Sequence, residues 1–246
     1  MIFYAHTSQN PDGSPADKKL WEPLFTPDSD CKALAGQPCP ECENLHPQHG
    51  HLNKVAHLAG KFAAQMFPEG PDRETAKQWG YLAGLWHDLG KYQKSFQDKL
   101  EGENISVEHT GAGAVLAKNV FKDHLSIGTH HYPLAAVIAG HHTGLSNFRD
   151  QEQGKLTPLL QRLKNNEPLN LDWDSVTEKL LSEKNVPALP SWCQSASQGD
   201  PAAFSLTFFT RMIFSCLVDA DSLVTEALEN ERRSYNYTSI EDLSFH

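Results

Sequence analysis

Histidine and aspartate residues recur beside apolar, helix-forming segments, and this arrangement constrains the fold more than any other feature of the sequence. The chain has 13 histidines in 246 residues. Burying imidazoles and carboxylates is costly unless something pairs with them. The fold must therefore bring these side chains to a common partner, and metal ions are the simplest one. Five separated places carry such residues next to positions that should be buried: His51, His87-Asp88, His109, His141-His142 and Asp221.

Apolar residues return at three- and four-residue steps through most of the chain, which is typical of amphipathic helices. We find no alternating strand pattern longer than a few residues. The sequence therefore predicts an all-α fold, a single-domain helical bundle with a metal site between its helices. Helices are expected from His51 to Met66, from about Asp72 to His87-Asp88, around Tyr92–Leu100, after His109, from Pro133 to His141-His142, and over Phe204–Leu228.

The remaining segments are more polar and divide the chain into three parts. Seven prolines fall in residues 1–50, so this part is expected to be an irregular segment packed on the domain. Residues 51–230 are predicted to form the domain itself, and residues 231–246 a polar tail or linker. Within the domain, short helices are expected at Leu156–Leu163 and Asp174–Leu181, followed by a Pro/Ser/Gly loop.

Composition limits the kinds of partner. The formal net charge of −10 argues against a broad basic surface that grips DNA, although bound divalent metals can reverse the local potential of a site. No apolar run reaches the roughly 18 residues that a membrane helix needs. The start of the sequence lacks the basic flank and apolar stretch of a signal peptide. We therefore expect a cytoplasmic protein with no membrane partner.

The cysteines leave two interpretations open. Their number, five, is odd, which does not suggest a disulfide framework in a chain of this length. Cys39 and Cys42 form a Cys-x2-Cys half-site for a structural zinc, with Cys31, His46 and His49 nearby. The alternative is a loop with free thiols.

The paired ligands have a geometry suited to a metal centre. Neighbouring residues such as His87 and Asp88 lie about 100° apart on a helix. At a helix end, which Gly90 favours here, both side chains can turn toward one site, and the carboxylate can bridge two metals. His141-His142, followed by Gly144, has the same geometry.

The order of these residues resembles a known family. His51, His87-Asp88 and Asp221 match the H…HD…D pattern of the HD phosphohydrolase superfamily, an HD-type helical bundle. The surrounding sequence is similar to the HD nuclease domain of the CRISPR-associated helicase–nuclease of type I systems. The similar stretches are Tyr4–Ser8, Ala83–Lys91, Phe96-Gln97, His109–Ala114, Ala139–Leu145 and Phe214–Asp221.

The resemblance implies roles for individual residues. His51, His87, Asp88 and Asp221 would hold one metal, and Asp88, His109, His141 and His142 the second. Asp219 is an alternative to Asp221, and Lys91 would contact the scissile phosphate. Asp88 and Lys91 are thus the expected catalytic residues. Two metals can clamp the attacking and leaving oxygens of a phosphodiester. Five imidazoles favour Mn, Fe, Co or Ni over Mg, which prefers oxygen ligands.

The resemblance also implies single-stranded DNA as substrate, cut internally and then degraded from its ends. It implies a superfamily 2 helicase and a guide-RNA surveillance complex as partners. The chain has no G-x-x-x-x-G-K-[ST] loop, so a helicase would be a separate subunit or another part of a longer polypeptide.

Several alternatives stay open at this point. An HD hydrolase of nucleotides or cyclic nucleotides shares H…HD…D, and a catalytically silent HD module would bind a partner instead. His109 could be a structural helix cap, and Asp221 a buried, hydrogen-bonded aspartate. His6 could line the site or have a structural role. Phe148 and Arg149 could hold a base and a phosphate, or belong to an ordinary loop.

Overall fold

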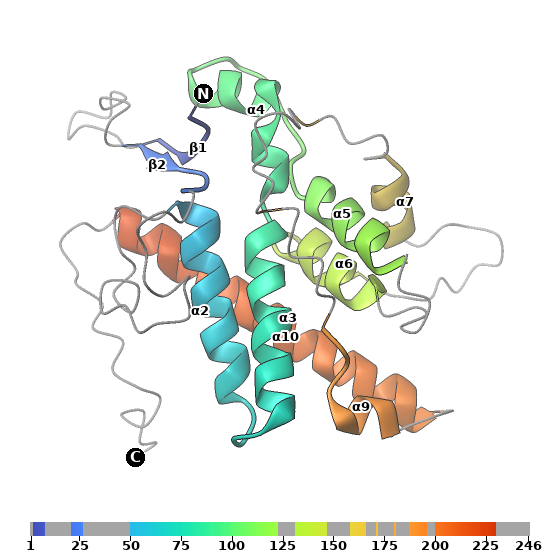
Figure 1. The fold of residues 1–246 in the computed structure, drawn as a ribbon. Coiled ribbons are helices and arrows are strands. Elements are labelled where there is room, and N and C mark those ends of the chain that lie inside the picture. Colours follow the sequence, from blue (N-terminus) through green and yellow to red (C-terminus); the bar gives the residue numbers. More distant parts are fainter. Residues whose placement is uncertain are drawn as a thin grey trace.

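The computed structural model confirms the all-α fold (Figure 1). The described residues are 2–7, 21–26, 50–122, 131–146, 158–165, 171, 180, 187–195 and 200–229. The helices are α2 (His51–Gln65), α3 (Pro71–Trp86), the 3-10 helix η2 (Leu89–Tyr92), α4 (Lys94–Leu100), α5 (Gly111–Lys122), α6 (His131–Gly140), α7 (Pro158–Asn165), α9 (Ser191–Ser195) and α10 (Asp200–Glu229).

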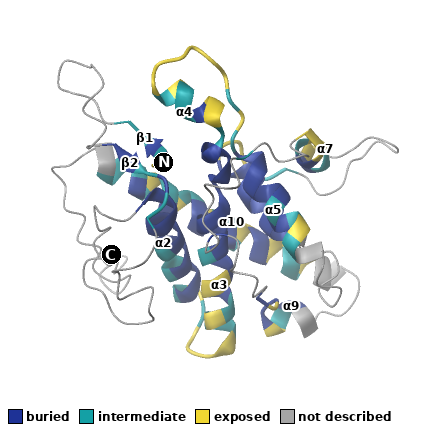
Figure 2. Ribbon diagram, turned by 45° about the horizontal axis from the view of Figure 1, so that its top comes forward, coloured by how far each residue is buried: buried dark blue, intermediate teal, exposed yellow. Residues whose placement is uncertain are grey.

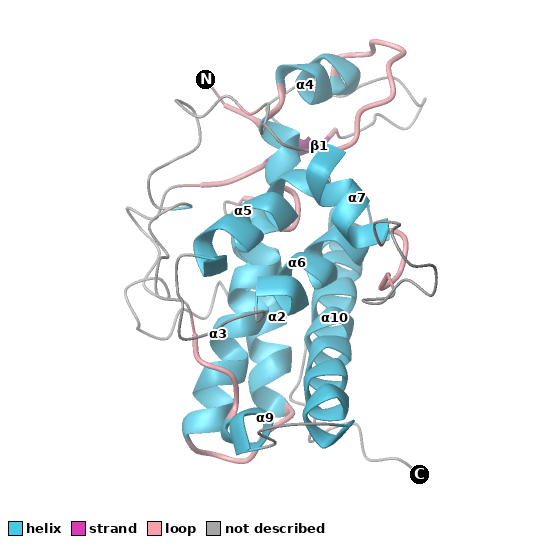
Figure 3. Cartoon of the chain, turned by 90° about the vertical axis from the view of Figure 1, so that its right-hand side faces the viewer, coloured by secondary structure: helices cyan, strands magenta, loops and turns pink. Residues whose placement is uncertain are grey.

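Helices α2 and α3 lie side by side, α10 packs obliquely across both, and the three form the centre of the bundle (Figures 1 and 3). Their facing sides are buried (Figure 2). Small residues set the spacing of the first two helices. A Cβ on Gly84 would lie 2.6 Å from the Ala56 Cα, and one on Gly80 would lie 2.5 Å from the Ala59 carbonyl oxygen. The two backbones therefore touch at these glycines.

Two tryptophans of α3 anchor a distant stretch of chain. Trp79 and Trp86 are 1% and 0% exposed. A buried indole needs an acceptor for its N–H. The Trp79 Nε1 donates to the Ala188 carbonyl and the Trp86 Nε1 to the Leu180 carbonyl, each at 2.9 Å. These bonds hold residues 180 and 188 against the core.

The N-terminal segment contains a short antiparallel ribbon that the sequence did not predict. Strands β1 (Tyr4–His6) and β2 (Glu22–Pro23) pair with His6 opposite Glu22. Strands of three and two residues are too short to leave a pattern of alternation.

Hydrogen bonds fasten this ribbon to the helices. The Leu24 carbonyl accepts from the Leu52 N–H at 2.9 Å, at the start of α2. The Gln97 side chain of α4 accepts from the Tyr4 N–H and donates to the Tyr4 carbonyl, both at 3.0 Å. Among the described residues of 1–50, the ribbon is therefore an integral layer of the bundle.

Two expectations differ from the structure near the start of α10. The predicted loop after residue 181 contains α9, and Phe204 and Phe208, predicted to be core, are 72% and 48% exposed. The first turns of α10 lie beside α9 and not across α2 and α3, so they have little to pack against (Figure 1). Most of the expected helix at Asp174–Leu181, and the tail at 231–246, lie outside the described residues.

Within the part of the chain that the structure describes, no helix is both long enough and apolar enough to cross a bilayer.

The contact between α2 and α3 gives a test of the fold. Replacing Gly84 with Ala forces the two backbones apart, and we expect it to lower the free energy of unfolding by about 1–3 kcal/mol, as overpacking does. Gly140, whose Cβ would meet its nearest neighbour at 3.4 Å, is the matched control. Gly140→Ala should be neutral or stabilising. Urea unfolding of both variants measures the difference, and equal stabilities would contradict this packing.

Candidate metal centre

Five elements bring the predicted ligands to one region of the bundle. Most of the side chains sit at the ends of helices, where a helix surface gives way to a turn and two neighbouring residues can face one point. The ligands are His51, the first residue of α2; His87-Asp88, directly after α3; His109, just before α5; His141-His142, directly after α6; and Asp221, within α10.

The Asp88 carboxylate lies at the middle of this cluster and is 1% exposed. Its Oδ2 is 3.6 Å from the His51 Nε2 and 3.4 Å from the His87 Nε2. Its Oδ1 is 3.6 Å from the His109 Nε2 and 3.4 Å from the His141 Nε2. Each oxygen of one carboxylate thus faces a different pair of imidazoles.

Asp221 completes the first group. Its Oδ1 lies 3.3 Å from the His51 Nε2 and 3.6 Å from the His87 Nε2. Asp219, the alternative, is exposed. Helix periodicity accounts for the difference, because Asp221 is four residues after the buried Leu217 and three before the buried Val224.

His142 completes the second group at the edge of the cluster. Its Nε2 lies 3.3 Å from the His109 Nε2, and its ring centroid is 3.9 Å from that of His141. His142 is exposed and the His109 side chain is 18% exposed, whereas His51, His87 and Asp88 are buried. The cluster therefore opens to solvent on the side of His109 and His142.

Two close contacts between backbone segments determine where His87, Asp88 and His109 lie. A side chain on Gly90 would overlap the His109 carbonyl, and one on Gly113 of α5 would overlap the Trp86 carbonyl. The α3–η2 turn can therefore lie directly against the start of α5. Glu108, which the sequence analysis missed, accepts from the Thr110 and Gly111 N–H groups at 3.1 and 3.2 Å and caps α5.

Backbone carbonyls orient two of the buried rings. The Nδ1 of His87 donates to the Gly84 carbonyl, and that of His141 donates to the Ile138 carbonyl, both at 2.7 Å. A neutral imidazole with its proton on Nδ1 presents a lone pair at Nε2. Both Nε2 atoms point into the cluster, which is the usual arrangement of histidines that bind metals.

The donor set fits divalent metal ions. Asp88 Oδ1 and His141 Nε2 are buried and make no hydrogen bond, although they face each other. Within the described residues, three overlapping groups around Asp88 have donor atoms within 4.8 Å of one another: His51 with His87 and Asp88, His87 with His141 and Asp221, and Asp88 with His141 and His142.

Neighbouring carboxylates raise the pKa of two buried histidines of the cluster. Burial lowers the pKa of His51, but the Glu22 charge and bonds to Asp221 and Asp88 outweigh it and raise the pKa to about 10. Burial also lowers the pKa of His87, and the Asp88 and Asp221 carboxylates raise it to about 9. Burial would raise the pKa of Asp88, but Lys91 and His87 hold it well below its usual range.

Lys91 and His6 border the cluster. The Lys91 Nζ lies 2.7 Å from Asp88 Oδ2 and 3.4 Å from the His6 Nε2. Burial and the neighbouring Lys91 charge lower the pKa of His6 to about 3, so His6 is neutral at pH 7. His6 therefore lines the site as an uncharged ring.

Other predicted features fall outside the described residues. These are Phe148 and Arg149, and the zinc half-site of Cys39 and Cys42 with its neighbours Cys31, His46 and His49.

A comparison with protein families matches residues 49–170 to the HD domain. Residues 49–170 are therefore similar to an HD domain. HD domains are metal-dependent phosphohydrolases, and the matched segment supplies every predicted ligand except Asp221. The HD domain and the His/Asp cluster together indicate a divalent metal site and hydrolase chemistry. The comparison with curated proteins gives no match.

The raised histidine pKa values predict how metal-free protein responds to pH. A group whose pKa is higher in the folded than in the unfolded state stabilises the fold below its unfolded pKa, here 6.5, and loses that contribution as pH rises through the folded pKa. With pKa values of about 10 for His51 and about 9 for His87, the free energy of unfolding should fall between pH 7 and pH 9.

Metal binding should show the opposite trend, because a cation must displace these protons. The rise in melting temperature on adding Mn²⁺ is expected to be larger at pH 8 than at pH 6. Calorimetric melts with chelator or with Mn²⁺ measure both effects. Metal-free stability that stays flat or rises above pH 7 would show that the two imidazoles are not held as charged groups.

Proposed function

We propose that this protein is a metal-dependent nuclease that cuts single-stranded DNA in type I CRISPR interference. The HD domain supports phosphodiester hydrolysis, and the order of motifs outside H…HD…D supports the narrower assignment. The observation that supports the proposal is the placement of the Asp88 carboxylate. Its Oδ2 faces the imidazoles of His51 and His87. Its Oδ1 faces those of His109 and His141. A single carboxylate placed in this way suits a pair of metals.

The proposed ligand sets share Asp88. His51, His87 and Asp221 would hold one metal with it, and His109, His141 and His142 the other. Mn, Fe, Co or Ni suits these imidazole-rich sets better than Mg. When bound, such a pair would supply Lewis acidity and would lower the pKa of water, so that hydroxide is available as a nucleophile near neutral pH.

The residues of the chain have separate tasks in this proposal. His51, His87 and Asp88 exclude water from the inner part of the centre, since each is at most 1% exposed. His109 and His142 lie on the side that opens to solvent, so the DNA strand approaches there. Lys91 holds a phosphate oxygen through its ammonium group, which lies beside Asp88.

The wider role is part of the proposal. Single-stranded DNA is produced by unwinding, so the nuclease requires a superfamily 2 helicase, in the same polypeptide or as a separate subunit. A guide-RNA surveillance complex would select the DNA. The acidic net charge of −10 is consistent with a substrate that is delivered by partners and held at the metals.

The central test is cleavage of circular single-stranded DNA over a series of metals. Mn, Co or Ni should support cutting, and Asp88→Asn or Asp221→Asn should slow it by at least about 100-fold, the upper end of what loss of an outer-shell partner costs. Asp219→Asn, two residues away and exposed, is the matched control and should retain activity. Hydrolysis of nucleotides or cyclic nucleotides without DNA cleavage would favour the alternative HD hydrolase and overturn the nuclease assignment.

Lys91 gives a second test, which separates substrate contact from metal binding. Lys91→Met should lower the cleavage rate by about 100- to 1,000-fold, as removal of one preorganised electrostatic group does. Metal affinity should stay equal or rise, because a positive charge beside Asp88 is removed. Lys94→Met is the control, since Lys94 is exposed and pairs with Asp98. Loss of metal from Lys91→Met would instead assign Lys91 to holding Asp88.

A further inference from the structure

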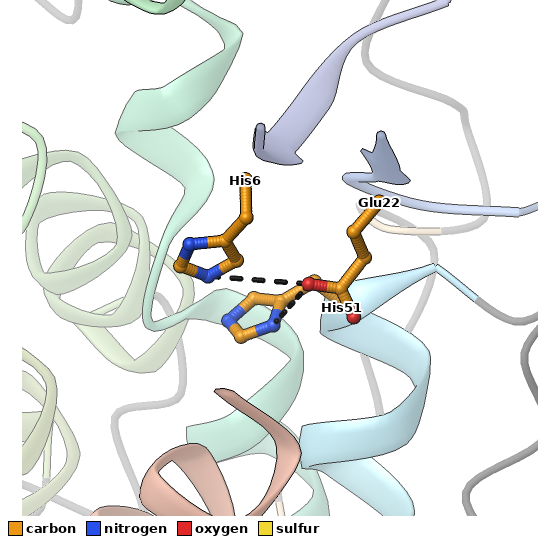
Figure 4. A group of neighbouring side chains, drawn as sticks. All are labelled: His6, Glu22 and His51. Atoms are coloured by element: carbon orange, nitrogen blue, oxygen red, sulfur yellow. Dashed lines mark ion pairs between the residues drawn. The ribbon is translucent and has the colours of Figure 1, made fainter. Parts of the chain in front are cut away.

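Glu22 is a buried carboxylate beside the metal centre. It belongs to β2, is 3% exposed, and points at His51 (Figure 4). Its Oε1 accepts from the Lys54 Nζ at 2.7 Å, and its Oε2 lies 3.3 Å from the His51 Nδ1. Lys54 pairs with Oε1, but the buried Oε2 and the buried His51 Nδ1 have no hydrogen-bond partner other than each other, so this placement needs an explanation.

His51 lacks the anchor that His87 and His141 have. Those two rings donate from Nδ1 to a carbonyl three residues earlier in their own helices. His51 is the first residue of α2, so no helical turn precedes it to offer such a carbonyl. Its Nδ1 faces Glu22, while its Nε2 faces His87, Asp88 and Asp221.

We propose that Glu22 is a positioning residue of the metal centre, accepting the His51 Nδ1–H so that the Nε2 lone pair faces the metal. The inference rests on the proposed metal-dependent function and names a residue outside the segment that matches the HD domain. A carboxylate behind a metal-bound imidazole fixes the proton on the far nitrogen and raises the basicity of the near one.

Lys54 and the ribbon hold Glu22 in position. Lys54 is 9% exposed and follows His51 by three residues on α2, so both side chains reach the same face. The ribbon is tied to α2 by the Leu24 carbonyl and the Leu52 N–H. Asn53 adds two bonds, accepting from the Thr26 N–H at 2.9 Å and donating to the Thr26 carbonyl at 3.1 Å.

Three side chains, His6, Glu22 and His51, have donor atoms within 4.8 Å of one another and could form a different cation site. Charge disfavours it. The Lys54 ammonium lies 2.7 Å from Glu22, and the Lys91 ammonium lies 3.4 Å from the His6 Nε2. A divalent cation there would be repelled by two positive groups, so the positioning role accounts for Glu22 better.

The test is metal binding by Glu22→Gln, measured as Mn²⁺ affinity and stoichiometry by electron paramagnetic resonance. We expect the variant to bind Mn²⁺ about 10- to 100-fold more weakly than the wild type, the usual cost of losing such a partner. Glu103→Gln removes an exposed carboxylate and is the matched control, with unchanged affinity expected.

A spectroscopic signature separates positioning from general structural support. In zinc-loaded wild-type protein, NMR should show a downfield His51 Nδ1 proton that exchanges slowly, and Glu22→Gln should lose that protection. Should Glu22→Gln not fold, Lys54→Gln decides the matter, since loosening Glu22 should still weaken Mn²⁺ binding severalfold.

Three results would overturn the inference. Wild-type affinity in Glu22→Gln, or in Lys54→Gln where Glu22→Gln does not fold, would show that Glu22 does not position His51. Loss of one whole equivalent of metal in both Glu22→Gln and His6→Ala, with the remaining affinity unchanged, would show the different cation site at His6, Glu22 and His51. Wild-type protein that binds no Mn²⁺ would contradict the proposed metal-dependent function as well. Failure of the Glu22 inference alone is therefore distinguishable from failure of the proposed function.

Discussion

The structure depends on one buried carboxylate and the imidazoles that surround it. Asp88 is 1% exposed and touches groups from the end of α3, the start of α2, the approach to α5 and the end of α6. A charge in such a place is tolerated only when it is fully paired. The helical bundle therefore has to bring several helix ends to Asp88 at once, and its close glycine contacts serve that requirement.

Much of this arrangement follows from the sequence, because the buried residues of a helix recur with a period of about 3.6 positions. The spacing of apolar residues predicted α2 and α3 nearly to the residue, but it left Asp219 open as an alternative to Asp221. The ligand pairs His87-Asp88 and His141-His142 could be located because Gly90 and Gly144 mark where the helices stop. Gly144 has a φ of +88°, which favours glycine and ends α6.

Other parts could not be predicted, for physical reasons. Glu22 lies in a strand of two residues within a proline-rich segment, so no periodicity marks it as buried. Its environment arises from a contact with Lys54, 32 residues away in sequence. Phe204 and Phe208 follow the helical pattern, but the pattern cannot show that this end of α10 has little to pack against. Tertiary contacts decide both cases.

The two carbonyl-anchored rings differ from His51 in how substitutions can reach them. Every amino acid carries a main-chain oxygen, so a substitution at position 84 or 138 keeps an acceptor atom for His87 or His141, even where it strains the packing, as at Gly84. The partner of His51 is the side chain of Glu22 on strand β2, and a single substitution there can remove it. Within one cluster, the ring orientations of His87 and His141 therefore depend on the backbone of their own helices, and that of His51 depends on a side chain distant in sequence.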